Sequence, residues 1–120
     1  MKLYEFEGMQ IFQMAGIQTP RHVVLKSIEE LEQTYDLLHK GSVVVKAQTL
    51  AGKRGKAGAI KFCDTKLAAK NAVTQMLNKI ILNETVTKVL VAEKLAVDKE
   101  YYLGLIFSQE LRSPVLILST

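Results

Sequence analysis

The sequence lacks most of the features that mark secreted, metal-binding and membrane proteins. Its 120 residues include one cysteine, two prolines, two histidines and no tryptophan. A single thiol excludes an intramolecular disulfide framework and is typical of a reducing compartment. The two histidines lie far apart in the sequence, so no local pattern predicts a zinc site. The longest apolar run has four or five residues, far fewer than the roughly 20 that a membrane span needs.

The N-terminal segment does not resemble an export signal. Residues 1–7 contain two acids where a signal peptide needs an apolar stretch. The chain is 48% hydrophobic and 23% charged, a composition that excludes intrinsic disorder. We therefore expect a soluble domain, or a large piece of one, that is cytoplasmic, or located in the mitochondrial matrix if the source is eukaryotic.

Positive charge is concentrated in one stretch of the chain. The net charge is +4, yet residues 46–70 hold seven lysines and arginines against Asp64 alone, so the rest of the chain is net negative. A local excess of this kind predicts a site for an anionic ligand rather than positive charge spread over the whole surface. The residues alone do not distinguish between three anionic ligands, which are a nucleotide phosphate, a nucleic acid and an acidic protein.

Hydrophobic spacing and turn residues predict a chain that mixes helices with strands. Apolar residues recur at helical spacing in residues 4–15, in residues 28–40 and from Asp64 to Ile80. Gly16 is expected to end the first helix, and caps are expected at Ser27 with Glu30 and at Asp64. Alternating or β-branched runs predict six strands, at residues 22–25, 42–48, 59–63, 88–92, 100–107 and 115–119. The chain ends directly after an apolar strand, and we expect it to be truncated.

The strongest chemical candidate is Lys46 with the loop that follows it. Lys46 stands directly after three valines, where a cation is unfavourable to bury unless an anion meets it. Residues 49–58 hold three glycines and three cations, which favours a backbone that approaches phosphate oxygens. A second interpretation stays open, in which Lys46 reaches solvent from a strand end and the loop is a basic hairpin. A P-loop is excluded, since its first glycine and its hydroxyl would fall on Leu50 and Ala57.

Other polar residues give weaker signals. Glu93 and Glu100 flank a charged connection and suit a ribose hydroxyl or a metal, but the residues alone favour a solvated turn. His22 and His39 have no partners nearby in the sequence, so neither is assigned a role. Cys63 lies in an expected strand and is predicted to be a small core residue.

Several segments resemble one family from end to end and in order. They are Leu3–Gly8, Gly16–Ile17 with Pro20, Val44–Gln48, Ala51–Gly58, Val89–Val91, Lys99–Leu103, and Pro114–Ile117 with Ser119–Thr120. The series Gln-x-x-Ala-Gly-x-Arg-Gly-Lys-Ala-Gly after a valine–lysine strand is far more specific than a lone glycine loop. On these motifs the chain resembles the β subunit of succinyl-CoA synthetase. Malate–CoA ligase and ATP-citrate lyase share the motifs, so they do not fix the acid.

The resemblance implies the N-terminal portion of an ATP-grasp fold, of class α+β, with a mixed or antiparallel sheet and about three helices. We expect an N-terminal helix in residues 1–20, a small nucleotide-binding subdomain in 21–95 and the first strands of the larger subdomain in 96–120. In the family, ATP phosphorylates a histidine of the partner α subunit. The phosphoryl group then passes on, so that succinate and CoA form succinyl-CoA, with ADP and phosphate as the other products.

The resemblance also implies which residues hold the nucleotide, ATP or GTP. They are Lys46 for the phosphates, Lys53, Arg54 and Gly55 for the loop that covers them, Ala92 and Leu95 for the adenine, largely through backbone groups, and Glu100 for the ribose. Two of these positions depart from the family. Lys53 replaces a usual glycine, which restricts positive φ there, and Ala92 replaces a frequent glutamate.

The family chain is roughly three times as long as this one by the usual domain arithmetic. The resemblance places the Mg²⁺ ligands, and the contacts with the α subunit, CoA and the dicarboxylic acid, in parts that this sequence does not include. We therefore assign no catalytic and no metal-binding residue here. Phosphoryl transfer depends on metal and positioning, so we expect this chain alone to have no ligase activity.

The alternative function is a small basic module that binds nucleic acid through residues 46–70. Such modules interleave cations with aromatic rings on which bases stack. Phe62 is the one aromatic residue in this stretch, so the stacking surface is lacking and nucleic acid is the less favoured ligand.

Overall fold

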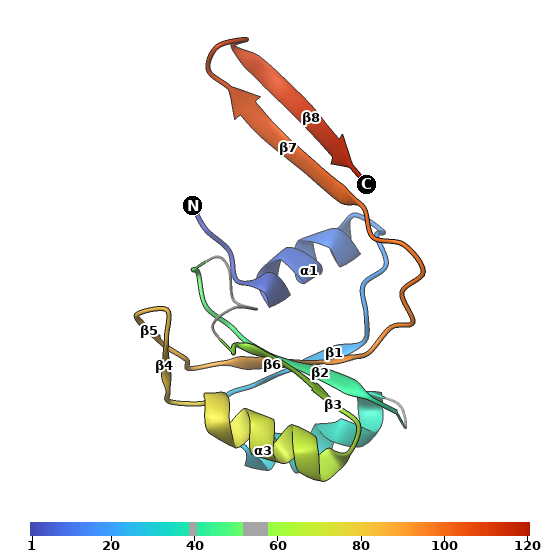
Figure 1. Cartoon of the computed structure of the whole chain (residues 1–120), viewed down its shortest axis with the longest axis vertical. Coiled ribbons are helices and arrows are strands. Elements are labelled where there is room, and N and C mark those ends of the chain that lie inside the picture. Colours follow the sequence, from blue (N-terminus) through green and yellow to red (C-terminus); the bar gives the residue numbers. More distant parts are fainter. Residues whose placement is uncertain (39–40, 52–57) are drawn as a thin grey trace.

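The central sheet of the molecule is built only from antiparallel neighbours. The computed structural model describes residues 1–38, 41–51 and 58–120 (Figure 1). The strand order is β1-β6-β2-β3, with the bounds β1 His22–Leu25, β6 Val89–Glu93, β2 Val43–Ala47 and β3 Ile60–Cys63. Each pair of neighbours runs antiparallel. The α+β class and the antiparallel sheet expected from the sequence are confirmed.

Helices cover one face of this sheet. Helix α2 (Glu29–Thr34), the 3-10 helix η1 (Tyr35–Leu38) and helix α3 (Lys66–Met76) lie on one side of it (Figure 1). The core between them contains Leu25, Leu31, Leu38, Val43, Val45, Val73, Met76, Val89 and Val91. Helix α1 (Glu5–Met14) lies on the opposite side and has no buried residue. Within the described ranges, no helix has the length and apolar character to cross a membrane.

The boundaries of the first two helices follow the sequence in part. The first helix ends as predicted, because Gly16 adopts φ +78°, a left-handed conformation that glycine tolerates without strain. The second is shorter than predicted, since the chain tightens into a 3-10 helix at Tyr35. Its predicted capping box is wrong. The N-cap is Ile28, and the Glu30 carboxylate accepts a hydrogen bond from the backbone N–H of Lys26 at 3.1 Å.

The predicted cap of the third helix is also wrong. Thr65 caps α3, where its hydroxyl oxygen accepts a hydrogen bond from the backbone N–H of Ala68 at 3.1 Å. Asp64 instead accepts a hydrogen bond from the Ser42 hydroxyl at 2.6 Å, which ties the end of β3 to the start of β2. Either residue type can cap a helix, so the sequence alone did not distinguish the two.

A short hairpin after α3 was not predicted. It pairs β4 (Ile80–Ile81) with β5 (Glu84–Thr85), so Ile80 is exposed and does not belong to the helical stripe. The turn requires positive φ at Leu82 and Asn83, at 54° and 63°. Leucine is rare in that conformation, so the turn has no clear sequence signal.

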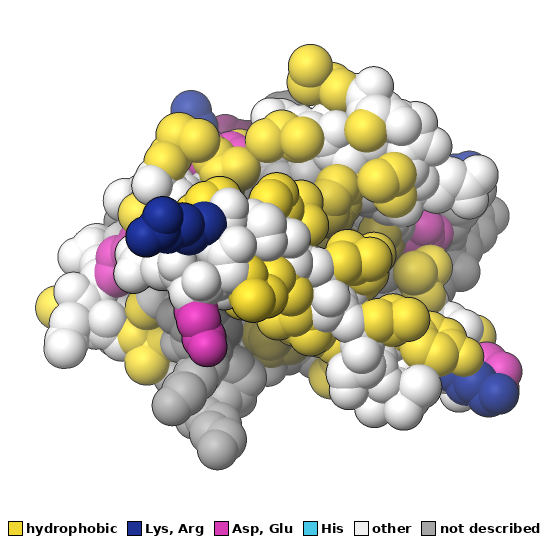
Figure 2. Space-filling view, turned by 90° about the horizontal axis from the view of Figure 1, so that it is seen from above, with side chains coloured by type: hydrophobic (Ala, Val, Ile, Leu, Met, Phe, Trp, Pro, Cys, Tyr) yellow, Lys and Arg dark blue, Asp and Glu magenta, His cyan; other side chains and the backbone are white. Residues whose placement is uncertain are grey.

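A second hairpin stands apart from the sheet and exposes hydrophobic side chains. Strands β7 (Tyr102–Ser108) and β8 (Ser113–Ser119) pair antiparallel around a turn, as the sequence predicted. The exposed side chains include Tyr102, Leu103, Leu105, Ile106, Phe107, Leu116, Ile117 and Leu118. They lie at both odd and even positions, so both faces of the hairpin are apolar. Figure 2, seen from this end of the molecule, shows hydrophobic side chains gathered there.

Replacing a core leucine should separate packing from surface effects. Leu31 is fully buried in α2, whereas Leu37, a few residues later, is 67% exposed. We expect Leu31→Ala to lower the free energy of unfolding by about 2–5 kcal/mol, because it leaves a cavity under the sheet. Leu37→Ala should change it by no more than about 0.5 kcal/mol. Urea denaturation followed by circular dichroism measures both, and equal effects would contradict the described core.

The thiol of Cys63 should react slowly and should make stability depend on pH. The side chain is buried, as predicted, and burial raises the pKa of the Cys63 thiol. The unfolded chain therefore loses this proton at lower pH than the folded chain does. We expect a contribution to stability that is full below the ordinary thiol pKa and is lost as pH rises through the folded value.

Two measurements check this expectation. Iodoacetamide at pH 8.5 should alkylate the folded chain much more slowly than the chain in guanidinium chloride. The free energy of unfolding should decline above pH 8.5 more steeply in the unsubstituted chain than in Cys63→Ala. Parallel declines in the two proteins would show that the thiol is not the titrating group.

Candidate functional site

A cleft of about 530 Å³ lies on the face of the sheet opposite α2 and α3. Along β2 the side chains alternate, so Val43 and Val45 enter the core while Val44 and Lys46 line the cleft. The other lining residues come from β3, from the end of β6 and from the segments beside them, and they are Pro20, Ile60, Phe62, Glu93, Lys94, Leu95, Val97 and Glu100. The cleft is therefore built from four separate parts of the chain.

Much of the lining of the cleft is apolar, and we call its residues Val44, Ile60, Phe62, Leu95 and Val97 the apolar wall. Phe62 is the cross-strand partner of Val44, which places its ring on the open face of the sheet. The ammonium of Lys94 lies 5.3 Å from the centre of this ring. A flat aromatic surface with a cation over it suits a planar, electron-rich group such as a nucleotide base.

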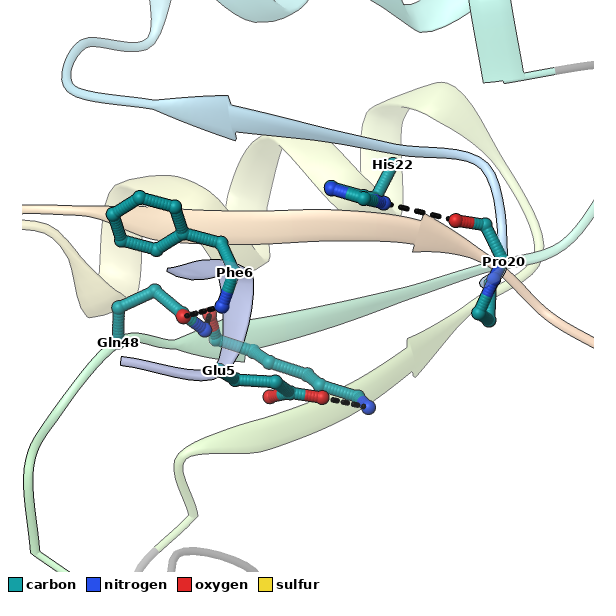
Figure 3. A network of polar contacts seen from close by, with 6 residues as sticks. Glu5, Phe6, Pro20, His22 and Gln48 are labelled. Carbon is teal, nitrogen blue, oxygen red and sulfur yellow. Dashed lines mark hydrogen bonds and ion pairs between the residues drawn. The ribbon is translucent and has the colours of Figure 1, made fainter. Parts of the chain in front are cut away.

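Lys46 also lines the cleft, where Ile60 of β3 is its cross-strand partner. Its ammonium donates a hydrogen bond to Oε1 of Glu5, in the first turn of α1, at 2.8 Å (Figure 3). The side chains of Lys46 and Glu5 are 26% and 19% exposed. A partly buried lysine is thus ion-paired with a carboxylate that lies 41 positions earlier in the sequence.

The first turn of α1 is held against the sheet by polar contacts. Gln48, which is buried, accepts a hydrogen bond from the backbone N–H of Phe6 at 3.2 Å (Figure 3). This N–H is one of the donors that a helix leaves unsatisfied at its N-terminus. The amide of Gln48 also donates to the carbonyl of Lys46 at 3.3 Å, so one side chain joins helix and strand.

Aromatic and acidic groups complete this attachment. The rings of Tyr4 and Phe6 stack at 5.8 Å, and the ammonium of Lys88 lies within 5.4 and 5.7 Å of their centres. Oε1 of Glu84, in β5, accepts a hydrogen bond from the Tyr4 hydroxyl at 3.5 Å, and its Oε2 accepts one from the backbone N–H of Leu50 at 2.9 Å. Residues 4–6, with these partners, form what we call the N-terminal anchor.

The structure brings together part of the residue set implied by the family resemblance. Lys46, Leu95 and Glu100 line the one cleft. Ala92 is buried between β1 and β2, where it pairs with His22 and Val44, and it is not among the lining residues. Lys53, Arg54 and Gly55 lie outside the described residues. The roles of all seven residues stay predictions.

Three residues of the site had not been singled out from the sequence, namely Glu5, Phe62 and Lys94. Phe62 had a usable signal, because the expected hairpin of residues 42–48 and 59–63 sets it opposite Val44. The contact of Lys94 with Phe62 can be predicted only when the position of β6 in the sheet is known. Glu5 had no signal, since the helix that carries it is remote in sequence from β2.

Both members of the acidic pair considered from the sequence, Glu93 and Glu100, line the cleft. Oε1 of Glu93 accepts a hydrogen bond from the backbone N–H of Arg21 at 2.9 Å, which fixes the start of β1 beside β6. Glu100 is exposed at the margin of the cleft. Among the described residues no three histidine, cysteine, aspartate or glutamate side chains gather as a metal site. A ring nitrogen of His22 lies 2.9 Å from the carbonyl oxygen of Pro20, a local contact (Figure 3).

Comparisons with known proteins agree along the whole chain. A family model described as an ATP-grasp domain matches residues 2–120. The β subunit of ADP-forming succinate–CoA ligase from Staphylothermus marinus is 40% identical over 119 residues, which cover 99% of this chain and 31% of that protein. Subunit β 1 from Archaeoglobus fulgidus is 43% identical with the same coverage. The chain thus spans about a third of the length of these curated relatives.

Solved structures show the same fold. An acetyl-coenzyme A synthetase of Ca. Korarchaeum cryptofilum, in complex with coenzyme A, Ca-AMPCP and HgCl+, superposes with a TM-score of 0.83 at 19% identity, over 98% of this chain and 53% of that one. Phosphoribosylamine–glycine ligase from Thermotoga maritima superposes with a TM-score of 0.70 at 20% identity, over 96% of this chain and 27% of that one. The fold expected from the sequence is therefore confirmed.

Removing the amide of Gln48 should loosen the N-terminal anchor. In Gln48→Ala the N–H of Phe6 loses its acceptor, and we expect its hydrogen exchange to accelerate about five- to tenfold, equivalent to about 1 kcal/mol of local opening. Gln10→Ala, at an exposed position of the same helix, should leave the rate unchanged. Amide exchange followed by NMR measures both. Unchanged exchange in Gln48→Ala would contradict the described contact.

Proposed function

The chain belongs to the ATP-grasp domain family, and on this premise we propose that its cleft binds the nucleotide of an acid–CoA ligase. The observation that carries the proposal is the lining of one cleft, which combines the cation Lys46 with the apolar wall. A nucleotide needs both an apolar surface and a cation, since its base is planar and apolar and its phosphates are anionic. The composition of this cleft fits such a ligand.

The chemistry of the lining residues suggests one orientation for the nucleotide. The base would lie on the apolar wall beside Phe62 and Leu95, with Lys94 near its edge. The phosphates would meet the ammonium of Lys46, which has three N–H donors and gives one to Glu5. Glu100, at the margin, has a carboxylate that can accept hydrogen bonds from ribose hydroxyls.

The remaining family positions extend this proposal. Lys53, Arg54 and Gly55 would cover the phosphates, and backbone groups near Ala92 and Leu95 would contact adenine. The arrangement fits ATP or GTP. When bound, Mg²⁺ would neutralise phosphate charge, and its protein ligands would come from outside the described residues, since these offer no cluster of three.

The whole enzyme of which this chain would be a part is a succinate–CoA ligase of the ADP-forming type. Relatives that carry this name support the proposal at 36–43% identity over 119 residues. The chain would act as the N-terminal nucleotide-binding portion of the β subunit, with the divisions near residues 20 and 95, in the cytoplasm. An α subunit would be its partner, CoA and a dicarboxylic acid would be substrates of the complete enzyme, and the chain alone would be inactive.

The nucleic-acid alternative is the less favoured proposal. Phe62, the aromatic residue within the basic stretch, forms part of the cleft rather than an exposed row of rings. The pairing of Lys46 with Glu5 likewise takes one cation of that stretch away from the outer surface.

Calorimetric titration of ATP, with and without Mg²⁺, tests the proposed cleft. We expect saturable binding to the unsubstituted chain and a loss of at least about tenfold in affinity for Lys46→Ala, because hydrogen bonds between charged groups contribute about 1.5–3 kcal/mol. Lys79→Ala removes an exposed lysine that does not line the cleft and should bind as the unsubstituted chain does.

Two outcomes would contradict the proposal. Absence of binding would show that the described cleft does not hold a nucleotide by itself. An equal loss in Lys46→Ala and Lys79→Ala would indicate a general electrostatic effect and not a contact with Lys46, and such a loss would disappear as salt is raised.

A further inference from the structure

The contact between Lys46 and Glu5 joins two elements that could have been independent. Lys46 belongs to β2, and Glu5 to the first turn of α1, yet their side chains meet at 2.8 Å and are both mostly shielded from water. A lysine side chain has four rotatable bonds and takes many conformations when nothing holds it. The carboxylate of Glu5 restricts Lys46 to a conformation that leaves it in the lining of the cleft.

The position of Glu5 relative to the cleft is the second observation. Glu5 lines a neighbouring hollow of about 640 Å³, together with Leu3, Met9, Phe12 and Ile17, and is not among the residues that line the cleft. The carboxylate therefore approaches the ammonium from the side of α1. Two N–H donors of Lys46 remain for another acceptor, so a phosphate in the cleft can bind without displacing Glu5.

The third observation is how Glu5 is held. Its chain neighbours Tyr4 and Phe6 are both fixed by the N-terminal anchor, through the stacked rings, Lys88 and Gln48. None of the ten residues of α1 is buried. The place of Glu5 thus depends on a few polar and aromatic contacts rather than on a packed helix.

We propose that Glu5 is a positioning residue for nucleotide binding, which orients the ammonium of Lys46 toward the phosphates. The inference rests on the proposed function, because it assumes that the cleft holds a nucleotide. An unheld lysine must lose rotamer freedom when it binds phosphate, which weakens binding by up to about thirtyfold. Glu5 removes that loss in advance. Attachment of α1 therefore sets the nucleotide affinity of the cleft.

Glu5 could also weaken nucleotide binding, and the direction of the change in ATP affinity distinguishes this effect from positioning. A carboxylate beside the phosphate-binding cation repels phosphates, and if repulsion dominated, its removal would tighten binding. Lys46 lines the cleft and Glu5 does not, so a phosphate bound there meets the ammonium more closely than the carboxylate. We therefore expect the orienting effect to prevail.

The experiment compares ATP with adenosine, which lacks the phosphates. In Glu5→Ala we expect ATP affinity to fall about tenfold by calorimetry, while adenosine affinity, measured by NMR titration, stays within about twofold. Glu5→Gln keeps an oxygen that accepts a hydrogen bond from Lys46, so it should restore part of the ATP affinity. Gln10→Ala is the control within α1, because Gln10 is exposed and takes part neither in the lining of the cleft nor in the contact with Lys46.

Each other outcome overturns a defined statement. Unchanged or tighter ATP binding in Glu5→Ala overturns the positioning role while the proposed function stands. Equal losses for ATP and adenosine, or an equal loss in Gln10→Ala, would show that Glu5 only supports the structure of α1. If the unsubstituted chain binds no ATP, the proposed function fails, and this inference fails with it.

Discussion

The alternation of side chains along β2 is the constraint on which the other features depend. Val43 and Val45 turn toward the helices and are fully buried, and each such burial contributes roughly 1.5–3 kcal/mol. The period of two then forces Val44 and Lys46 onto the open face. A shift of one residue in register would bury the lysine and expose the valines. Hydrophobic packing on one side of the sheet thereby fixes where the charge appears on the other.

Much of the fold could be predicted because its signals are local. The strands at residues 22–25, 43–47 and 102–119 follow from β-branched content and alternation, and α3 from its apolar stripe. The errors occur where neighbouring residues compete for one role, as Asp64 and Thr65 do at a cap. They also occur where tertiary packing imposes an unfavourable backbone, as at Leu82.

The candidate site was less accessible to sequence reasoning, for a physical reason. Lys46 stood out because a cation after three valines is unusual wherever it lies. Its partner Glu5 is an ordinary acid in a helical turn, and only the fold places it at 2.8 Å. The same holds for Lys94, which meets Phe62 because β6 lies two strands from β3 in the sheet. Charge pairs between remote segments are set by topology, which local patterns do not encode.

The β7–β8 hairpin has a consequence for how the protein behaves at high concentration. In the described chain, these strands form a two-stranded sheet of their own, with outer edges that offer backbone donors and acceptors to another strand. Because both faces are also apolar, a ribbon of this kind is a template for intermolecular sheets. Solubility, rather than the stability of the core, then limits the concentration at which the chain stays dispersed, and lysine or proline placed on these strands would raise that limit.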